Sequence, residues 1–338
     1  MNDVMQALAI NQWGDSDVFE HVQIPVPTPE ADDVLVKVAY AGLNPADWKM
    51  RAGHLAQAMP NLSFPLVMGL DASGTVVAVG ENVTSLNVGD RVASGTNLFH
   101  SGKPGSYAQY VVVNAQRAVK IPDSISLAAA ATLTTPSITA WQALFATGKG
   151  ALSNARGKKI LINGASGGVG SFAVQFAKNA GAEVATTSST QNLSYVKSLG
   201  SHFLIDYKTQ DITARLNSFA PDGVDIILDA VSAGSLNNPL DMLKPGGTLI
   251  SIATITDDGD IEASMALAKE KGVQHVYAIV SDEGMKEQLT KIVAMADAGE
   301  VVLPPTESFL MNDIAVAHKR METGHAQGKL VLKMGTES

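Results

Sequence analysis

The sequence contains no cysteine among its 338 residues. That absence excludes disulfide bonds, thiolate metal ligands and cysteine nucleophiles together, and it agrees with a reducing cytosol. Positive charge is also scarce, since 24 Lys and Arg stand against 33 Asp and Glu, a formal net charge of −9. A surface that binds nucleic acid needs clustered Lys and Arg, so we expect no nucleic-acid partner.

Long hydrophobic runs are missing as well. No apolar stretch reaches the length of a membrane-spanning helix, and residues 1–7 lack the basic and apolar regions of a signal peptide. With 46% hydrophobic and 17% charged residues, the composition is typical of a globular protein. We therefore expect a cytoplasmic protein with no membrane partner, and the chain length favours two domains.

The first part of the chain, residues 1–125, is rich in short β-prone segments. Turns with Gly, Pro and Asp separate these segments, and their spacing is uneven, which predicts a distorted barrel. The clearest candidates for strands are 33–40, 74–79 and 107–113. Residues 301–338 return to short irregular segments and end on an expected strand, 329–333, which we expect to rejoin this first domain.

Strand and helix patterns alternate over residues 126–300, which is typical of a parallel sheet with crossover helices. Such a sheet with six strands is a complete Rossmann dinucleotide-binding domain. The predicted fold class is therefore α/β, with a distorted β-barrel over 1–125 and 301–338 and a doubly wound sheet over 126–300. The six expected strands are 159–163, 183–187, 203–206, 224–229, 248–253 and 275–280.

A glycine-rich turn, 164–170, follows the first of these strands and opens a helix. The backbone N–H groups at such a helix N-terminus bind a pyrophosphate, and glycine lets the phosphates approach closely. The turn stands in the strand–turn–helix context that this motif requires. We predict that the cofactor contacts its residues Gly164, Ser166, Gly167, Gly168, Val169 and Gly170.

The same turn also matches G-x-S-x-G, the nucleophile elbow of α/β-hydrolases, with Ser166 as the nucleophile. A hydrolase would need an acid and a later histidine, and His275, His318 and His325 are available. It would not need the additional glycines, nor a β-rich domain before the sheet. The serine hydrolase therefore remains an alternative that lacks the expected structural context.

The end of the second expected strand indicates the type of nicotinamide cofactor. NAD-specific sites place an Asp or Glu about 20 residues after the glycines to hold the ribose 2′-hydroxyl. Residues 186–190 instead read Thr-Thr-Ser-Ser-Thr, without a carboxylate that would repel a 2′-phosphate. We predict NADPH as the cofactor, and a polar loop that selects neither cofactor is the alternative, because no arginine stands nearby.

Seven short motifs stand in the order found in medium-chain dehydrogenase/reductases, and the chain resembles that superfamily over nearly its whole length. The resemblance implies a GroES-like barrel as the first domain, beside the Rossmann domain. The motifs lie at 42–47, 69–74, 89–92, 105–108, 139–141, 164–170 and 328–332.

Zinc-dependent members of that superfamily hold catalytic zinc with a Cys, a His and a second Cys. The motifs place Asn44, Leu70 and Thr135 at these positions, and none of the three is a ligand of that kind. The chain therefore resembles the zinc-free branch, which comprises quinone oxidoreductases, ζ-crystallin-like proteins and alkenal or enone reductases. We expect no metal site.

The resemblance also assigns site residues. Asn44 and Thr139 match positions near the nicotinamide, and Ser188 and Tyr207 match positions near the adenosine 2′-phosphate. With Lys49 as a donor toward the substrate, the catalytic candidates are Asn44, Lys49 and Thr139. Further candidates for cofactor binding are Thr135, Asn192 and Lys329.

Two positions depart from the pattern of the quinone reductases. Asn192 replaces a frequent Lys, which removes one positive partner for a 2′-phosphate. Lys49 replaces a frequent Tyr, and an ammonium group there would suit donation to a small enolate. The acceptor predicted by the resemblance is thus a quinone or the C=C bond of an α,β-unsaturated carbonyl.

The resemblance further implies a homodimer in which residues 275–280 pair as an edge strand across a two-fold axis. This segment, HVYAIV, is apolar and uncharged, so a bare edge would invite aggregation and a second copy would cover it. An interior strand is the alternative. A protein that binds NADPH with little turnover also stays open as an alternative function.

Overall fold

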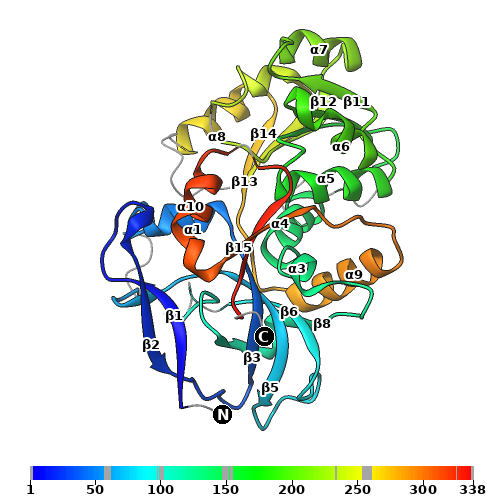
Figure 1. Ribbon diagram of the computed structural model, residues 1–338. Helices are drawn as coiled ribbons and strands as arrows, with labels where there is room; N and C mark the ends of the chain where they lie inside the picture. Colours follow the sequence, from blue (N-terminus) through cyan, green and yellow to red (C-terminus); the bar gives the residue numbers. More distant parts are fainter. Residues whose placement is uncertain are drawn as a thin grey trace. The chain divides into compact units, whose positions relative to one another are not determined.

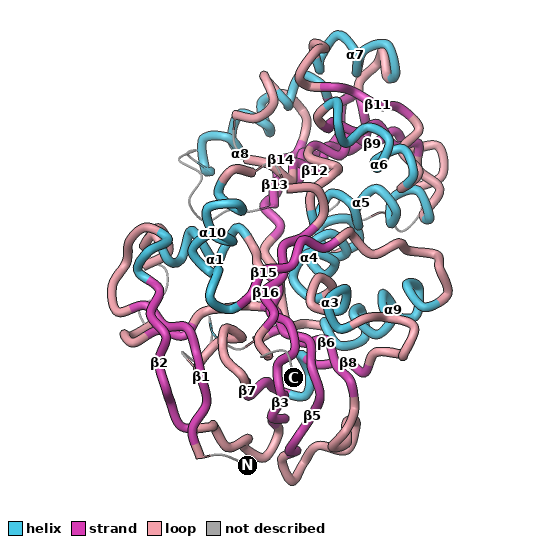
Figure 2. Tube along the Cα trace, in the orientation of Figure 1, coloured by secondary structure: helices cyan, strands magenta, loops and turns pink. Residues whose placement is uncertain are grey.

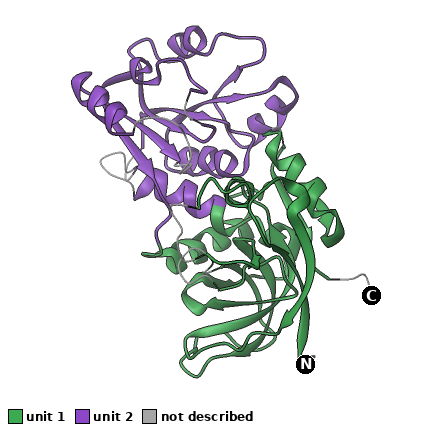
Figure 3. Ribbon diagram, turned by 90° about the vertical axis from the view of Figure 1, so that its left-hand side faces the viewer, with its two compact units in different colours: residues 1–135, 282–338 green, residues 136–281 purple. Residues whose placement is uncertain are grey.

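The structure is a computed structural model with two compact units, which Figure 3 shows in different colours. One unit combines residues 1–135 with 282–338, and the other comprises 136–281. The domain limits expected from the sequence remain a prediction, because a compact unit and an independently folding domain are different entities. The residues described are 3–56, 62–96, 98, 103–146, 152, 155–232, 234–252, 261–324 and 326–335.

The first unit is built mainly from antiparallel strands (Figures 1 and 2). A small sheet has the order β2-β1-β4, and a larger one has the order β15-β16-β3-β5-β6-β8, with β7 paired to β3. The strands are β1 Val4–Ile10, β2 Phe19–Pro25, β3 Asp33–Gly42, β4 Leu66–Val67, β5 Asp71–Val79, β6 Arg91–Gly95, β7 Tyr110–Asn114, β8 Ala118–Lys120, β15 Thr306–Leu310 and β16 Lys329–Lys333.

The expected strand at 107–113 begins later than predicted, because β7 starts only at Tyr110. Tyr107 is a fully buried side chain, and Ala108 makes an isolated bridge to Ala7 rather than a ladder. The described helices of this unit are α1 Pro45–Arg51, α3 Leu127–Ala130, α9 Met285–Asp297 and α10 Ile314–Glu322, and α4 Thr134–Phe145 starts at its limit.

The last strand, β16, pairs with a strand from the beginning of the chain. It runs antiparallel to β3 with Val331 opposite Gly42, and the Leu43 N–H donates to the Leu330 carbonyl at 3.0 Å. The C-terminal segment therefore joins the sheet that contains β3, and its assignment to the first domain stays a prediction. The pairing brings Lys329, the first residue of β16, close to the residues that follow β3.

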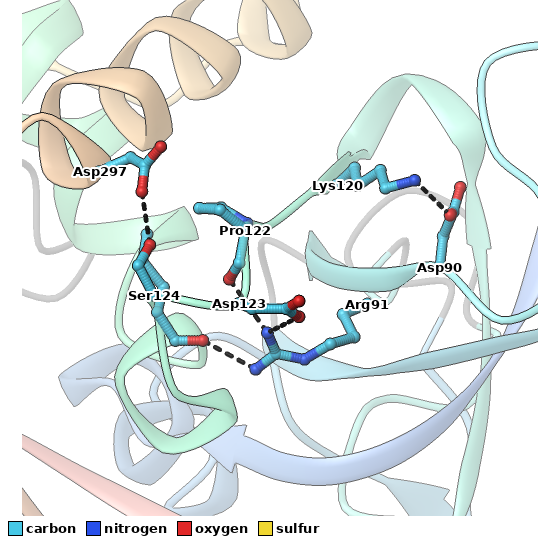
Figure 4. Close-up of polar contacts among 8 residues, drawn as sticks. Asp90, Arg91, Lys120, Pro122, Asp123, Ser124 and Asp297 are labelled. Carbon is cyan, nitrogen blue, oxygen red and sulfur yellow. Dashed lines mark hydrogen bonds and ion pairs between the residues drawn. The ribbon is translucent and has the colours of Figure 1, made fainter.

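Arg91 fixes the connection between β8 and α3 (Figure 4). Its guanidinium donates to the carbonyls of Pro122 at 3.0 Å and Ile125 at 2.7 Å, and to the Asp123 carboxylate at 3.1 Å. Ser124, inside the same connection, donates to Asp297 at the end of α9. Five donors in a rigid fork suit arginine to several carbonyls at once. These bonds hold the segment that leads to α3 and α4.

The second unit contains a six-stranded parallel sheet. Its strand order, β11-β10-β9-β12-β13-β14, is that of a complete Rossmann domain, so the predicted doubly wound sheet is confirmed. Figure 1 shows α5 and α6 along one side of the sheet and α8 along the other. The elements are β9 Lys159–Asn163, α5 Gly168–Asn179, β10 Glu183–Ser188, α6 Leu193–Ser198, β11 Phe203–Asp206, α7 Ile212–Phe219, β12 Val224–Asp229, β13 Leu243–Ile252, α8 Ile261–Glu270 and β14 Gln274–Ala278.

The buried strands explain why the sheet reads as short apolar runs. Ile160, Leu161 and Ile162 of β9 are all fully buried, as expected for a parallel strand covered on both faces. Strand β13 begins at Leu243, earlier than predicted, because Leu243 pairs with Val224 beyond a register irregularity. The predicted end of this strand at Ala253 lies outside the described residues.

Within the described part of the chain, no helix has the length and apolar character needed to cross a membrane.

Candidate active site

The glycine-rich turn joins β9 to α5 in the geometry that a dinucleotide requires. Gly164 has φ +78°, a left-handed conformation that favours glycine, and a Cβ on Gly170 would lie 2.2 Å from the Gly164 carbonyl oxygen. At Gly167, by contrast, the nearest protein atom to a Cβ would be 3.5 Å away. The protein's own packing therefore does not require glycine at 167.

The N-terminus of α5 is open to a ligand. Gly167 is its N-cap residue and contributes no side-chain bond, so the first N–H groups of the helix have no side-chain cap. These groups, together with the helix dipole, attract an anion. The missing Cβ at Gly167 leaves room for a phosphate at this point. The predicted residues Gly168, Val169 and Gly170 form the first turn, and the turn fits a dinucleotide pyrophosphate.

A buried hydrogen-bond network that sequence reasoning missed holds the first residue of the turn. Thr187 Oγ1 donates to Asn163 Oδ1 at 2.5 Å and accepts from the Gly164 N–H at 3.0 Å. Asn163 Nδ2 in turn donates to Asp229 Oδ1 at 2.8 Å and to Ser235 Oγ at 2.8 Å. Asn163, Thr187 and Asp229 lie at the carboxyl ends of three adjacent strands. The sequence signal that could have indicated this network is a polar residue at the end of each otherwise apolar strand.

The adenosine-end candidates lie around the end of β10. Ser188 is buried, and its Oγ has no hydrogen-bond partner among the described residues. Asn192 donates its amide to Ser166 Oγ at 3.1 Å and to Ser189 Oγ at 3.2 Å, so it links this region to the glycine turn. Tyr207 is 42% exposed and donates its N–H to the Ser188 carbonyl at 3.2 Å. The structure therefore brings the predicted residues of this end together.

In the first unit, Asn44 stands at the centre of a buried polar cluster. It is the N-cap residue of α1 and only 3% exposed. Its Nδ2 donates to Asp71 Oδ2 at 2.9 Å, and its Oδ1 accepts from the Lys329 ammonium at 2.6 Å. Its backbone N–H donates to Asp47 Oδ2 at 2.7 Å. Both ends of the amide are therefore fixed.

Asp71 joins Asn44 to the segment at the start of α4. Its Oδ1 accepts from the hydroxyl of Thr135 at 2.6 Å and from the backbone N–H of Thr135 at 3.0 Å. The Thr135 hydroxyl donates its single proton in this hydrogen bond, so it has no second proton to donate elsewhere. Asp71 was recognised in the sequence only as part of the 69–74 motif, next to the position of the missing zinc ligand. A carboxylate beside that position was the available signal.

Burial dominates the electrostatics of this cluster. It raises the pKa of the Asp71 carboxyl and lowers the pKa of the Lys329 ammonium, because each loses water around its charged form. Burial likewise raises the pKa of Asp47 to about 7. Lys329 also donates to the Leu43 carbonyl, so two of its three N–H groups have protein partners.

Two predicted catalytic residues lie outside these bonds. Lys49 is half-buried on α1, with its Nζ 5.8 Å from the centroid of the Trp48 ring. Thr139 lies on α4 one helical turn after Thr135, so the two side chains share a helix face. No described bond links Lys49 to Asn44 or Asp71, and its role remains a prediction.

A second buried group, also missed by sequence reasoning, links α1 to α10. The Arg51 guanidinium lies 3.3 Å from His318 Nδ1 and 2.7 Å from the Glu322 carboxylate. His318 Nε2 lies 3.2 Å from the Tyr107 hydroxyl, and burial lowers the pKa of His318 to about 3. A neutral His318 that accepts from Arg51 can donate to Tyr107. This group stabilises the helix that begins at the Asn44 cap.

The hydrolase alternative finds no support in the described bonds. Ser166 Oγ accepts from Asn192, whereas His275 lies within hydrogen-bond distance of Ser251 and Ser264. His318 belongs to the group around Arg51, and His325 lies outside the described residues. A serine nucleophile needs a base within hydrogen-bond reach.

The positions of the zinc ligands carry other interactions. Asn44 and Thr135 are bonded to Asp71, and Leu70 is a buried apolar side chain. Among the described residues, no group of three or more His, Cys, Asp and Glu has an arrangement that could hold a metal ion. Metal independence remains a prediction.

Comparison with known families gives two matches. A family described as alcohol dehydrogenase GroES-like domain matches residues 30–123, and one described as zinc-binding dehydrogenase matches residues 199–332. The first match lies in the antiparallel unit. The second includes most strands of the Rossmann sheet and the C-terminal strand β16.

Three relatives extend these matches over nearly the whole chain. The mitochondrial NAD(P)H oxidoreductase RTN4IP1 of Danio rerio is 32% identical over 98% of this chain and 92% of its own. A chloroplastic NADPH-dependent alkenal/one oxidoreductase of Arabidopsis thaliana is 32% identical, over 97% of this chain and 79% of its own. The structure of the quinone oxidoreductase of Coxiella burnetii matches with a TM-score of 0.86 and 30% identity, covering 98% of this chain and 100% of that one.

The pKa of Asp47 generates a prediction about stability. Its value in the folded protein, about 7, is above the 3.8 of an unperturbed Asp, so folding takes up a proton between these pH values. The favourable contribution of the protonated form is therefore lost as the pH rises through 7. The Asp47→Asn variant has no titrating proton at this position. The Tm of the variant minus that of the wild type should therefore increase from pH 5 to pH 8.

Calorimetric Tm values at pH 5, 6, 7 and 8 measure this effect. Asp17→Asn, which removes one exposed carboxyl from the same unit, is the matched control and should give a curve parallel to wild type. Parallel curves for Asp47→Asn and wild type would contradict the raised pKa.

Proposed function

We propose that this chain, which belongs to the medium-chain dehydrogenase/reductase superfamily and is an oxidoreductase with a nicotinamide cofactor, uses NADPH to reduce activated acceptors without a metal. The acceptor in this proposal is a quinone or the C=C bond of an α,β-unsaturated carbonyl. Quinones are our first choice and alkenals or enones our second. The proposal keeps the domain limits predicted from the sequence, 1–125 with 301–338 and 126–300, and the predicted cytoplasmic location.

The observation that carries the proposal is the hydrogen-bonded cluster at the positions of the zinc ligands. Asn44 and Thr135 are both bonded to the buried carboxylate of Asp71, and Leu70 offers no donor atom. Without a metal to stabilise an alkoxide, simple alcohols lack a group that drives their oxidation. A quinone or enone needs less help, because its conjugation spreads the charge that hydride addition creates.

Bound NADPH would supply the hydride, and the protein would supply binding, orientation and hydrogen bonds. The uncapped N–H groups of the first turn of α5 are the candidates for the pyrophosphate. Asn44, with both ends of its amide held, is the candidate for orienting the nicotinamide, together with Thr139. Thr135 gives its hydroxyl proton to Asp71 and therefore acts by positioning.

Reduction of the acceptor adds a proton as well as a hydride. Hydride addition places negative charge on an acceptor oxygen, and a donor near that oxygen stabilises the charge. The Lys49 ammonium is our candidate for this donor. Names of relatives support both acceptor classes, since one is a quinone oxidoreductase and another an alkenal/one oxidoreductase.

The reaction is tested by product analysis. Purified protein should oxidise NADPH with quinones, short enones or 2-alkenals, should show negligible oxidation of simple alcohols, and should keep its activity after dialysis against a chelator. Alcohol–ketone interconversion that requires stoichiometric zinc would contradict the proposal. Tight NADPH binding with no oxidation by any acceptor would favour a binding protein with little turnover.

The part assigned to Asn44 is tested in the same assay. Asn44→Ala should lower kcat on the order of 10- to 100-fold through misplacement of the nicotinamide, and should leave binding of 2′,5′-ADP nearly unchanged. Asn82→Ala is the matched control, because it removes an Asn–Asp hydrogen bond of 2.9 Å on the surface of the same unit. An equal loss in both variants would contradict the role of Asn44.

Cofactor preference is a separate prediction. Residues 186–190 contain no carboxylate, and the Ser188 hydroxyl has no partner among the described residues, so NADPH should bind more tightly than NADH. Since Asn192 stands where a Lys is frequent, the difference should be modest, ~1–2 kcal/mol. Fluorescence titration of both nucleotides measures it, and Ser188→Asp should shift the preference toward NADH. Equal or tighter binding of NADH by the wild type would refute the prediction.

The homodimer is also a proposal. Strand β14 is the last strand in the order of the described sheet, so one side of it has no strand partner there. Pairing with a second copy would complete its hydrogen bonds and cover its apolar residues. Light scattering at micromolar concentration should give the mass of a dimer, and a monomer would rule this assembly out.

A further inference from the structure

We propose that Asp206 is the residue that limits the preference of this protein for NADPH over NADH. The inference rests on the proposed use of NADPH and concerns the adenosine end of its site. The sequence places no carboxylate at the end of the second strand of the sheet. The structure brings one there from the third strand.

Asp206 is the last residue of β11, which runs parallel to β10. It is the register partner of Ser188, the last residue of β10, so the two residues end neighbouring strands side by side. Adjacent strands lie about 4.8 Å apart. The carboxylate of Asp206 is therefore close to Ser188, a predicted contact of the 2′-phosphate, and the next residue, Tyr207, donates its N–H to the Ser188 carbonyl.

The Asp206 carboxylate is held in place from both sides. Its Oδ2 accepts from the Thr190 hydroxyl at 2.5 Å, and its Oδ1 accepts from the Lys208 N–H at 3.0 Å. The bond from Thr190 is the main reason that the pKa of Asp206 lies below its usual range. The group is thus a fixed negative charge at neutral pH, and it has no described ammonium or guanidinium partner.

Asp206 also removes a donor from the segment that would bind a 2′-phosphate. Thr190 gives its hydroxyl proton to Asp206, and Thr187 gives its own to Asn163. Of the hydroxyls after Thr187, those of Ser188 and Ser189 remain as donors, because Ser189 accepts from Asn192 and Ser188 has no partner among the described residues. Asp206 therefore acts against a 2′-phosphate twice, through its charge and through the hydrogen bond that it takes from Thr190.

The test compares two ligands that differ only in the 2′-phosphate, 2′,5′-ADP and 5′-AMP. Isothermal titration of the full chain gives the dissociation constant of each, independently of turnover. In Asp206→Asn the affinity for 2′,5′-ADP should rise roughly five- to tenfold, because one like charge is removed nearby. The affinity for 5′-AMP should change less than about twofold, on the same electrostatic argument.

A charge control separates local from long-range effects. Asp222→Asn removes one exposed carboxylate just before β12, at the amino ends of the parallel strands, whereas Asp206 lies at a carboxyl end, and it should leave both affinities unchanged. Thr190→Val keeps the Asp206 charge and should not raise the affinity for 2′,5′-ADP. Binding of 5′-AMP reports that the adenosine site is intact, and Asp206→Ser replaces the Asn variant if that binding is lost.

The outcomes are distinct. A ratio of the two affinities that stays constant in Asp206→Asn and Asp206→Ser, or that rises equally in Asp222→Asn or Thr190→Val, would overturn the inference. The wild-type preference between NADPH and NADH tests the proposed function separately, since either result can be obtained with or without an effect of Asp206.

Discussion

An ammonium group and two carboxylates are buried together around Asn44, and the first unit depends on keeping them paired. Burying a single charge without a partner costs several kcal/mol, and removal of one member leaves the others uncompensated. Lys329 and Asp71 hold opposite ends of the same Asn44 amide. The orientation of Asn44 is therefore tied to the stability of the unit, and a conformational change of this side chain would break two buried hydrogen bonds at once.

Much of the fold was predictable because it depends on local patterns. Apolar runs ended by glycine predicted the parallel sheet, and the bounds of β9, β11, β12 and β16 agree with the expected strands. The β-prone type of Tyr107 predicts a strand, but its ring is buried in the core and the ladder begins three residues later. A single aromatic residue fits a strand and a buried loop equally well, so the residue type alone does not distinguish the two.

The candidate site was predictable only where a motif contains it. The glycine turn and Asn44 belong to motifs, and the structure describes them where the strand–turn–helix pattern and the 42–47 motif placed them. Asp206 and Asp229 lie outside the motifs, and the 69–74 motif contains Asp71 without indicating its partners, because each of the three carboxylates acts on a residue far away in the sequence. Whether Asp206 lies beside Ser188 depends on the register of two strands, and no local pattern determines that register.

The pairing of β16 with β3 has a consequence for the order in which the protein can be completed during synthesis. The second unit is one continuous segment, 136–281, whereas the first unit combines segments from both sides of it. Asn44 and the two carboxylates near it therefore leave the ribosome before the second unit, and they have no ammonium partner until Lys329 follows. The buried cluster can therefore form only after the whole of the second unit has been synthesised.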